Sequence, residues 1–205
     1  QPAINSTVTG GSELTGLRWT GFREIGVDDL VLRSKDWEGP AADVLQIEGL
    51  HAKLQFWPLL LGKVQFDTID IEKVTLRIAE RADDPGSINL ASLIAPITPD
   101  SKSTGSMIGR MEIDNLSIEV GVAEGDRYTP TAVEEFNVQI EPIDIRENLH
   151  SFLMAQNNTD AESPTLIKGW WNPSTMAFDL RLDGLNLASG SALAMSSSAR
   201  EFCNR

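Results

Sequence analysis

The sequence repeats one short apolar unit, and this repeat limits what the chain can fold into. In each unit, two apolar residues are separated by one residue. Two residues follow, and then come two further apolar residues that are also separated by one residue. The copies are Ile25-Val27/Leu30-Leu32, Leu45-Ile47/Leu50-Ala52, Val64-Phe66/Ile69-Ile71, Ile69-Ile71/Val74-Leu76, Met111-Ile113/Leu116-Ile118, Val138-Ile140/Ile143-Ile145 and Leu180-Leu182/Leu185-Leu187. The first intervening residue is always acidic: Asp28, Glu48, Asp67, Glu72, Asp114, Glu141 or Asp183. A two-residue period predicts strands with one apolar face, so the chain is expected to be mainly β.

The two intervening residues decide how such strands can be built. Side chains alternate along a strand, so an uncorrected insertion would turn the second apolar pair to the other face. A β-bulge or bend keeps both pairs on one face, and Gly49, Asn115, Pro142 and Gly184 are types tolerated there. A tight hairpin is the alternative, with arms of only about three residues. The favoured fold is a long, twisted, bulged antiparallel sheet that forms a curved trough or an open sandwich.

About eight strands are expected from this alternation. They are 14–20, 25–33, 44–56, 64–79, 108–123, 131–145, 165–171 and 176–188. Pro58 and Gly62 bracket one short helical turn that should cap an edge of the sheet. A second short turn is expected over 87–93, with Ser87 or Asn89 as its cap.

Polar and Ser-rich stretches divide the chain into predicted parts. Residues 13–95 form an N-terminal β module, 96–106 have linker composition, and 107–188 form a second sheet segment of the same type. Residues 148–164 are expected to be a polar connection in which only Phe152, Leu153 and Met154 pack. Residues 189–205 are expected to form a loose tail.

The charge balance excludes one class of partner. The chain has 17 Lys and Arg against 30 Asp and Glu, a formal net charge of -13. Nucleic-acid binding needs clustered basic residues, so no nucleic-acid partner is expected. The same balance disfavours attachment to anionic lipid through a basic patch, and any lipid contact is expected through acyl chains.

No constellation for catalysis or metal binding stands out. Cys203 is the single cysteine, and the two histidines, His51 and His150, have no metal-ligand spacing around them. Acid pairs such as Asp67 and Asp70 are read as a solvated face, and no nucleotide or nucleophile motif occurs. No enzyme activity and no cofactor are therefore expected.

The apolar face of the predicted sheet has two interpretations. It can be the core of a closed sandwich or barrel, which is the usual role of alternating strands. It can instead be an open groove, which carries more exposed apolar surface than a monomer tolerates without a ligand. The residues expected to line such a groove are Val27, Leu30, Leu32, Ile47, Leu50, Leu54, Ile69, Ile71, Val74, Leu76, Met111, Ile113, Leu116 and Ile118.

Four features in 13–93 occur in an order that resembles the AsmA-like family (AsmA/TamB type), which has a chorein-like N-terminal module. They are the Trp-containing strand pair of 17–21 and 25–30, the strand 47–54 running into the helix 58–62, the strand pair of 64–71 and 74–78, and the turn Gly86-Ser87-Ile88-Asn89 before Leu93. The segments 111–122, 136–140 and 169–187 are similar to further strands of the same repeating sheet.

The resemblance implies a function for the chain. Proteins of this kind are lipid-handling envelope proteins: an N-terminal inner-membrane anchor precedes a β-sheet trough in the periplasm, and they are associated with outer-membrane biogenesis. It implies phospholipid or another acyl-chain lipid as ligand, possible envelope protein partners, and an anchor or signal upstream of Gln1. The longest apolar run, 56–61, is too short to be that anchor.

A structural or adhesive module that binds protein by strand addition is the alternative function. Trp170 and Trp171 would be its surface anchors, because Trp is enriched in binding hot spots. The competing interpretation of this pair places one ring in the core and the other at the sheet rim.

Overall fold

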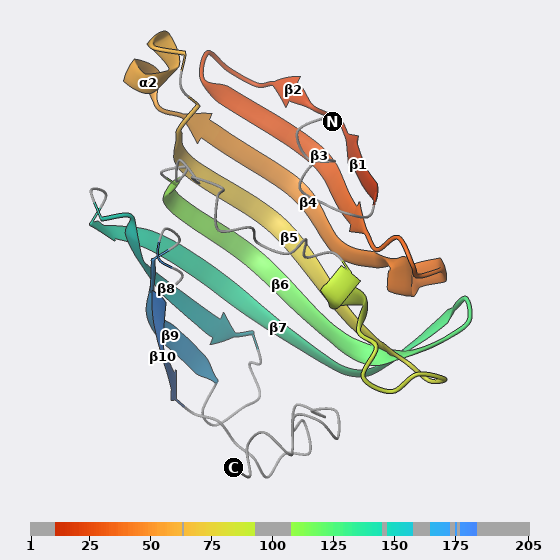
Figure 1. Cartoon of the computed structure of the whole chain (residues 1–205). Coiled ribbons are helices and arrows are strands. Elements are labelled where there is room, and N and C mark those ends of the chain that lie inside the picture. The colour runs from red at the N-terminus through yellow and green to blue at the C-terminus, as the bar shows by residue number, and fades with distance from the viewer. Residues whose placement is uncertain are drawn as a thin grey trace.

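In the computed structural model the chain forms one curved sheet, described for residues 11–62, 64–92, 108–144, 147–157, 165–172, 175 and 177–183 (Figure 1). Its strands are β1 (Gly11–Thr15), β2 (Arg18–Trp19), β3 (Glu24–Arg33), β4 (Asp43–Leu54), β5 (Phe66–Arg81), β6 (Ile108–Glu124), β7 (Arg127–Asp144), β8 (Leu149–Gln156), β9 (Leu166–Asn172) and β10 (Ala177–Asp183). The short helices are η1 (Gly39–Ala42), α2 (Phe56–Leu60) and η2 (Asn89–Ser92).

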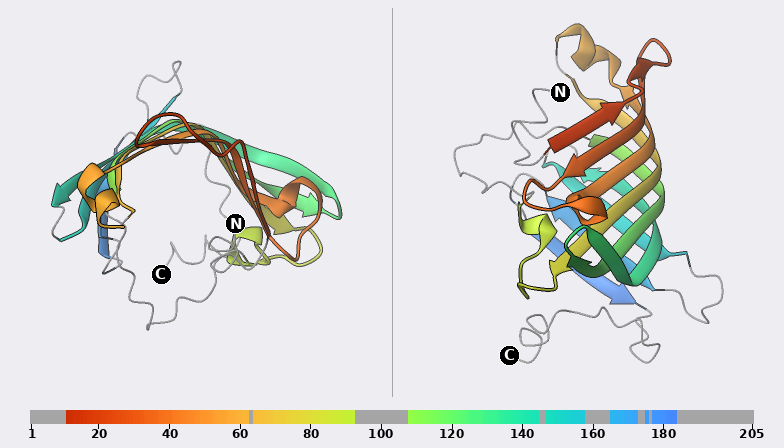
Figure 2. Two further views of the ribbon diagram at one scale, coloured as in Figure 1. Left: turned by 90° about the horizontal axis from the view of Figure 1, so that it is seen from above. Right: turned by 90° about the vertical axis from the view of Figure 1, so that its right-hand side faces the viewer.

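All ten strands belong to a single sheet in nearly sequential order. The order is β1-β3-β4-β5-β6-β7-β8-β9-β10, and β2 pairs with β3 beside β1. Neighbours are antiparallel except β5 and β6, which run parallel and join the two predicted modules into one sheet. Seen from above, the sheet is an open arch (Figure 2). No pairing joins its two edges among the described residues, so the closed sandwich or barrel is not found and the curved trough is confirmed.

The repeat units lie inside continuous strands, so the hairpin interpretation is wrong for the copies in β3 to β6. Three neighbouring positions are left unpaired where the strands are otherwise paired residue by residue: Asp28/Gly49, Gly49/Glu72 and Glu72/Asp114. Together they form one line across the four strands. Gly49 has φ +64°, and a Cβ at this position would lie 2.5 Å from the Glu72 carboxyl carbon. Because the irregularity falls in one row, all four strands reverse their alternation together and keep one apolar face.

Two segments differ from the sequence-based expectation. Residues 14–20 are two strands, because Gly16 at φ +67° turns the chain between β1 and β2. The predicted polar connection within 148–164 is wrong, since 149–156 form β8, paired on both sides with β7 and β9. The predicted linker 96–106 and tail 189–205 lie outside the described residues.

The short helices lie at the ends of the sheet. The predicted turn at 58–62 is α2, which connects β4 to β5 at one end (Figure 1). At the other end η1 and η2 meet the edge of β5, beyond its last pair with β4 at Leu45/Leu76. A small cluster of Trp37, Ala41, Ala79 and Ala123 packs there.

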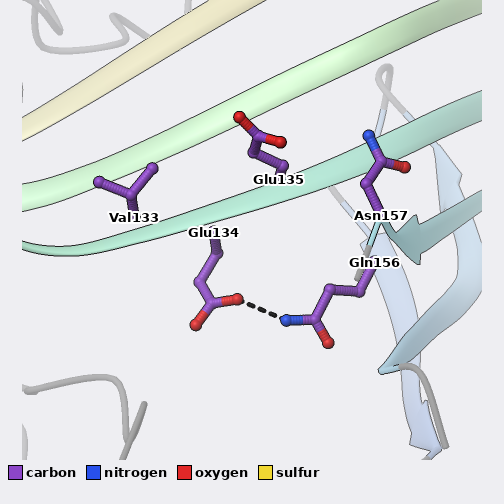
Figure 3. Close-up of a pocket in the computed structure, with 5 residues that line it drawn as sticks. All are labelled: Val133, Glu134, Glu135, Gln156 and Asn157. Atoms are coloured by element: carbon purple, nitrogen blue, oxygen red, sulfur yellow. Dashed lines mark hydrogen bonds between the residues drawn. The ribbon is translucent and has the colours of Figure 1, made fainter. Parts of the chain in front are cut away.

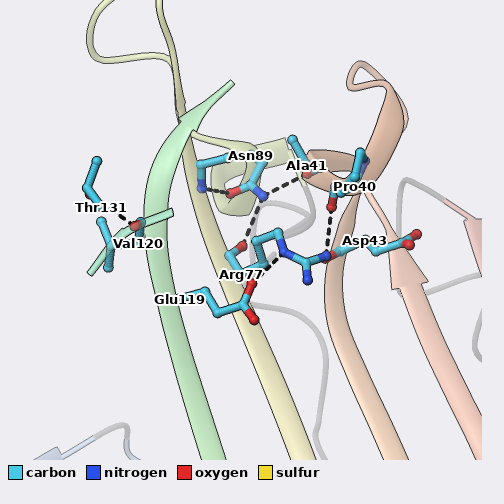
Figure 4. A network of polar contacts seen from close by, with 9 residues as sticks. Pro40, Ala41, Asp43, Arg77, Asn89, Glu119, Val120 and Thr131 are labelled. Carbon is cyan, nitrogen blue, oxygen red and sulfur yellow. Dashed lines mark hydrogen bonds and ion pairs between the residues drawn. The ribbon is translucent and has the colours of Figure 1, made fainter. Parts of the chain in front are cut away.

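Asn89 has a different role from the predicted helix cap. Its side chain is fully buried, accepts a hydrogen bond from the Ala79 N–H, and donates to the carbonyls of Arg77 and Ala41 (Figure 4). It therefore completes the hydrogen bonding of the β5 edge where β4 has ended.

Candidate functional site: the apolar concave face

The apolar side chains form rows that cross the sheet from strand to strand. One row contains Val27, Leu50, Ile71, Ile113, Val138, Met154, Ile167 and Leu182, one residue from each strand between β3 and β10. The next row towards α2 contains Ile25, Ala52, Ile69, Met111, Ile140, Phe152, Gly169 and Leu180. Each of these two rows is free of polar side chains over its whole length.

Two further rows continue the face beyond the Gly49 irregularity. The first contains Leu14, Leu30, Ile47, Val74, Leu116, Phe136 and Gln156, and the second contains Ser12, Leu32, Leu45, Leu76, Ile118 and Glu134. The intervening residues Glu48 and Lys73 lie off this face and form an ion pair of 3.3 Å. The irregularity therefore keeps charge out of the apolar rows.

Two observations place this face on the inside of the arch. Ile69, Ile71 and Val74 are buried although, among the described residues, no second layer of strands or helices covers them. Side chains on the inside of a strongly curved sheet converge and shield one another, whereas those on the outside diverge.

The hydrogen bonds of Asn89 give the second observation. They show that the peptide groups of Arg77 and Ala79 point to the β4 side of β5. In a strand of L-residues, the side to which the N–H and C=O of a residue point fixes the face on which its side chain lies. With β5 running as in Figure 1, the side chains of Arg77 and Ala79 lie on the outside of the arch, and those of Leu76 and Ile78 lie inside.

Every groove residue expected from the sequence except Leu54 lies in one of these four rows. Leu54 is almost fully buried at the end of β4, beside Phe66. Sequence reasoning missed the apolar part of the rows supplied by β7 to β10: Phe136, Val138, Ile140, Phe152, Met154, Ile167, Leu180 and Leu182. Four of these were recognisable, because Val138, Ile140, Leu180 and Leu182 belong to copies of the repeat.

A polar group closes the apolar face at β7 and β8. Glu134 and Gln156 end the two rows beyond the irregularity, and the Gln156 amide donates to the Glu134 carboxylate over 2.5 Å. The side chains of Glu135 and Val133 point to the opposite side of β7. They line a shallow pocket together with Asn157 (Figure 3). Such a carboxylate at the margin suits a boundary with water better than an apolar ligand.

The outer face carries the charges. Arg77 binds the Glu119 carboxylate at 2.8 Å and donates to the Pro40 carbonyl (Figure 4). Its guanidinium lies 5.3 Å from the centre of the Tyr128 ring. Burial, together with the negative charge of Glu119, raises the pKa of Tyr128 to about 12. At the opposite edge, hydrogen bonds from Lys168 and Arg181 lower the pKa of Asp183.

The remaining candidate residues are placed as follows. His51 is exposed, whereas His150 is buried with its ring 6.2 Å from that of Trp171. Trp170 is partly exposed and Trp171 is half-buried, which agrees with one ring at the rim. Within the described residues, no group of three or more His, Cys, Asp or Glu side chains could hold a metal ion. No helix there has the length and apolarity needed to cross a membrane.

The chain was compared with family models, curated proteins and solved structures. No family model matches the chain, and no curated protein or solved structure is significantly similar to it.

Proposed function

We propose that this chain is a segment of a lipid-handling trough whose concave apolar face holds acyl chains. The observation that carries the proposal is the pair of rows that cross eight strands without a polar side chain. A hydrocarbon ligand needs this kind of surface. Transfer of one acyl chain of about 16 carbons into water forfeits roughly 12 kcal/mol, at about 0.8 kcal/mol per methylene.

The charge distribution supports the same ligand class. In the four rows, Glu134 is the one ionisable side chain, and it stands at the margin. Acidic residues such as Asp70, Glu72 and Asp114 are exposed off the apolar face. An acyl chain along the rows would therefore meet no charge, while a headgroup would remain in water at the margin.

The family resemblance extends the proposal to location and partners. On this basis the chain is part of an AsmA-like envelope protein in the periplasm, with an inner-membrane anchor upstream of Gln1 and a role in outer-membrane biogenesis. The ligand is phospholipid or another acyl-chain lipid, and other envelope proteins are possible partners. Reading the codons upstream of Gln1 tests the anchor: a cytoplasmic start without a signal would remove the localisation.

Bound lipid is the direct test of the trough. We expect native mass spectrometry and solvent extraction of the purified chain to show bound phospholipid, and a fluorescent fatty acid to displace it. Ile113→Asn should weaken fatty-acid binding about tenfold, because loss of the apolar contact is worth about 1.4 kcal/mol. Ile113 is half-buried on the concave face, so the variant should stay folded.

Val133→Asn is the matched control. Val133 is an aliphatic residue of β7 that pairs with Glu119 and faces outward, so its replacement should leave fatty-acid binding unchanged. If the parent protein neither carries lipid nor binds the fatty acid, the trough proposal fails.

Strand addition is the second candidate function, and β10 is the observation that favours it. Among the described residues β10 pairs with β9 alone, and its Phe178, Leu180 and Leu182 side chains are exposed. A free strand edge with apolar side chains can accept a strand of a partner protein. Absence of lipid, combined with capture of an extended peptide at β10, would favour this function.

A further inference from the structure

Two segments far apart in the sequence meet at one end of the sheet. They are the turn between β2 and β3, within 17–23, and the segment around α2, within 53–65 (Figure 1). The Phe22 and Phe56 rings lie 6.0 Å apart, and the Leu54 N–H donates to the Arg23 carbonyl over 2.8 Å. We call these two segments together the tip.

The tip exposes large apolar side chains in a way that differs from the concave rows. The exposed fractions are 64% for Trp19, 80% for Phe22, 74% for Trp57, 62% for Leu60, 76% for Leu61 and 61% for Val64. By contrast, the central members of the rows are buried or half-buried by one another. The tip side chains point into solvent, and several neighbouring exposed apolar groups on one surface mark an interaction site.

The charge of the tip is opposite to that of the rest of the chain. Residues 17–23 and 53–65 contain Arg18, Arg23, Lys53 and Lys63 and no Asp or Glu. Outside the tip, 13 Lys and Arg stand against 30 Asp and Glu, which gives a net charge of -17. Arg18 is paired with Asp28, and Lys53 lies opposite Glu24 in the ladder, so acidic residues of β3 border the tip on one side.

We propose that the tip docks into the surface of a lipid bilayer that contains anionic headgroups. Trp and Phe side chains prefer the membrane interface, and Lys and Arg beside them are attracted to anionic lipid. The strongly acidic remainder is repelled by the same surface, so the molecule binds end-on. This inference rests on the tip alone and does not need the concave face to hold lipid.

A second copy of the chain fits the tip less well than a bilayer. A symmetric contact between two tips would oppose Arg23 and Lys53 of one copy to the same cations of the other, and like charges disfavour such a contact. An anionic bilayer combines the two properties that the tip matches, an apolar layer and a negative surface.

Vesicle co-sedimentation tests this docking. We expect the parent protein to sediment with vesicles of phosphatidylcholine plus phosphatidylglycerol, to do so less with phosphatidylcholine alone, and to be released partly by salt. The double variant Trp57→Glu with Leu60→Glu should lose at least tenfold in partitioning. Arg23→Gln with Lys53→Gln should lose the preference for phosphatidylglycerol and keep weak binding to neutral vesicles.

Phe178→Glu is the matched control, because Phe178 is an aromatic residue of β10 that is 69% exposed and lies outside the tip. Its vesicle binding should equal that of the parent. Both tip variants should also bind the fluorescent fatty acid as the parent does, which separates docking from the trough. Failure of the parent to sediment, an equal loss in Phe178→Glu, or dimerisation abolished by the tip variants would overturn the proposal.

Discussion

The central strands β4 to β6 and the terminal strand β10 share the same apolar rows but bury them very differently. Ile71 in β5 and Leu182 in β10 belong to one row, yet Ile71 is 6% exposed and Leu182 is 47% exposed. The strands β5 to β7 have 16 to 18 residues and a neighbour on both sides, whereas β10 has 7 residues and, in the described part, one neighbour. In the described part of this sheet, burial therefore follows from neighbours in the row, not from apolarity alone.

The largest expected effect comes from placing the same charge at the centre and at the edge of this row. Ile71→Asp should destabilise the protein by several kcal/mol, because an unpaired carboxylate would be held among buried aliphatic side chains. Leu182→Asp should change stability by less than about 1 kcal/mol, since the new carboxylate can reach water. Urea unfolding followed by circular dichroism measures both. Equal losses in the two variants would contradict the difference drawn between centre and edge.

A second variant tests what replaces a neighbouring strand at the end of β5. Asn89→Ala would leave the Ala79 N–H and the Arg77 and Ala41 carbonyls without their amide partner. We expect a loss of about 2–4 kcal/mol, since each buried unpaired backbone group costs about 1–3 kcal/mol and neighbouring losses do not add fully. The measurement is the denaturant midpoint. Asn137→Ala, on the exposed face of β7, should change this midpoint little.

The smallest expected effect is a difference in pH dependence between the two regions. The pKa of Tyr128 is raised in the folded protein, so its stabilising contribution is present below about pH 10 and is lost as pH rises towards about 12. Tyr128 is the single tyrosine, so phenolate absorbance reports it directly. Glu119→Gln should lower this midpoint by removing a nearby negative charge. A midpoint at the value of free tyrosine would contradict the burial of the ring.

The edge strands should respond to acid instead. Hydrogen bonds from Lys168 and Arg181 lower the pKa of Asp183, so its contribution is present above the unfolded value near 4 and is lost as pH falls below it. Asp183 is exposed, and solvent screening makes this contribution small. Carboxylate chemical shifts in an acid titration would measure it.

The alternation of the central strands could be predicted because each copy of the repeat fits one strand. The reversal at Asp28, Glu72 and Asp114 was readable as a bulge or bend, and the fold class follows from it. The alignment of these reversals in one row, with Gly49 among them, was not readable, because register depends on pairing between strands. The parallel pairing of β5 and β6 was hidden for the same reason.

Strand β8 and the tip could not be predicted from the sequence. In β8 the run Phe152-Leu153-Met154 puts apolar side chains on both faces, so the two-residue period is lost. The net charge of -13 argued against a basic membrane patch, because an average over the chain conceals four cations on two separate segments. Only the fold brings 17–23 and 53–65 together.

The shared row of reversals also has a consequence for how such a sequence can change over generations. Deleting one residue near Gly49 would give β4 a strict alternation without an irregularity, while β3 and β5 kept theirs. No substitution within β4 could repair this, because the mismatch would lie in the register between β4 and its two neighbours. A change of length at this row is therefore compatible with the sheet only when it occurs in all four strands β3 to β6. Substitutions of one apolar residue by another in the rows should be tolerated, whereas changes of length are expected in the turns between strands.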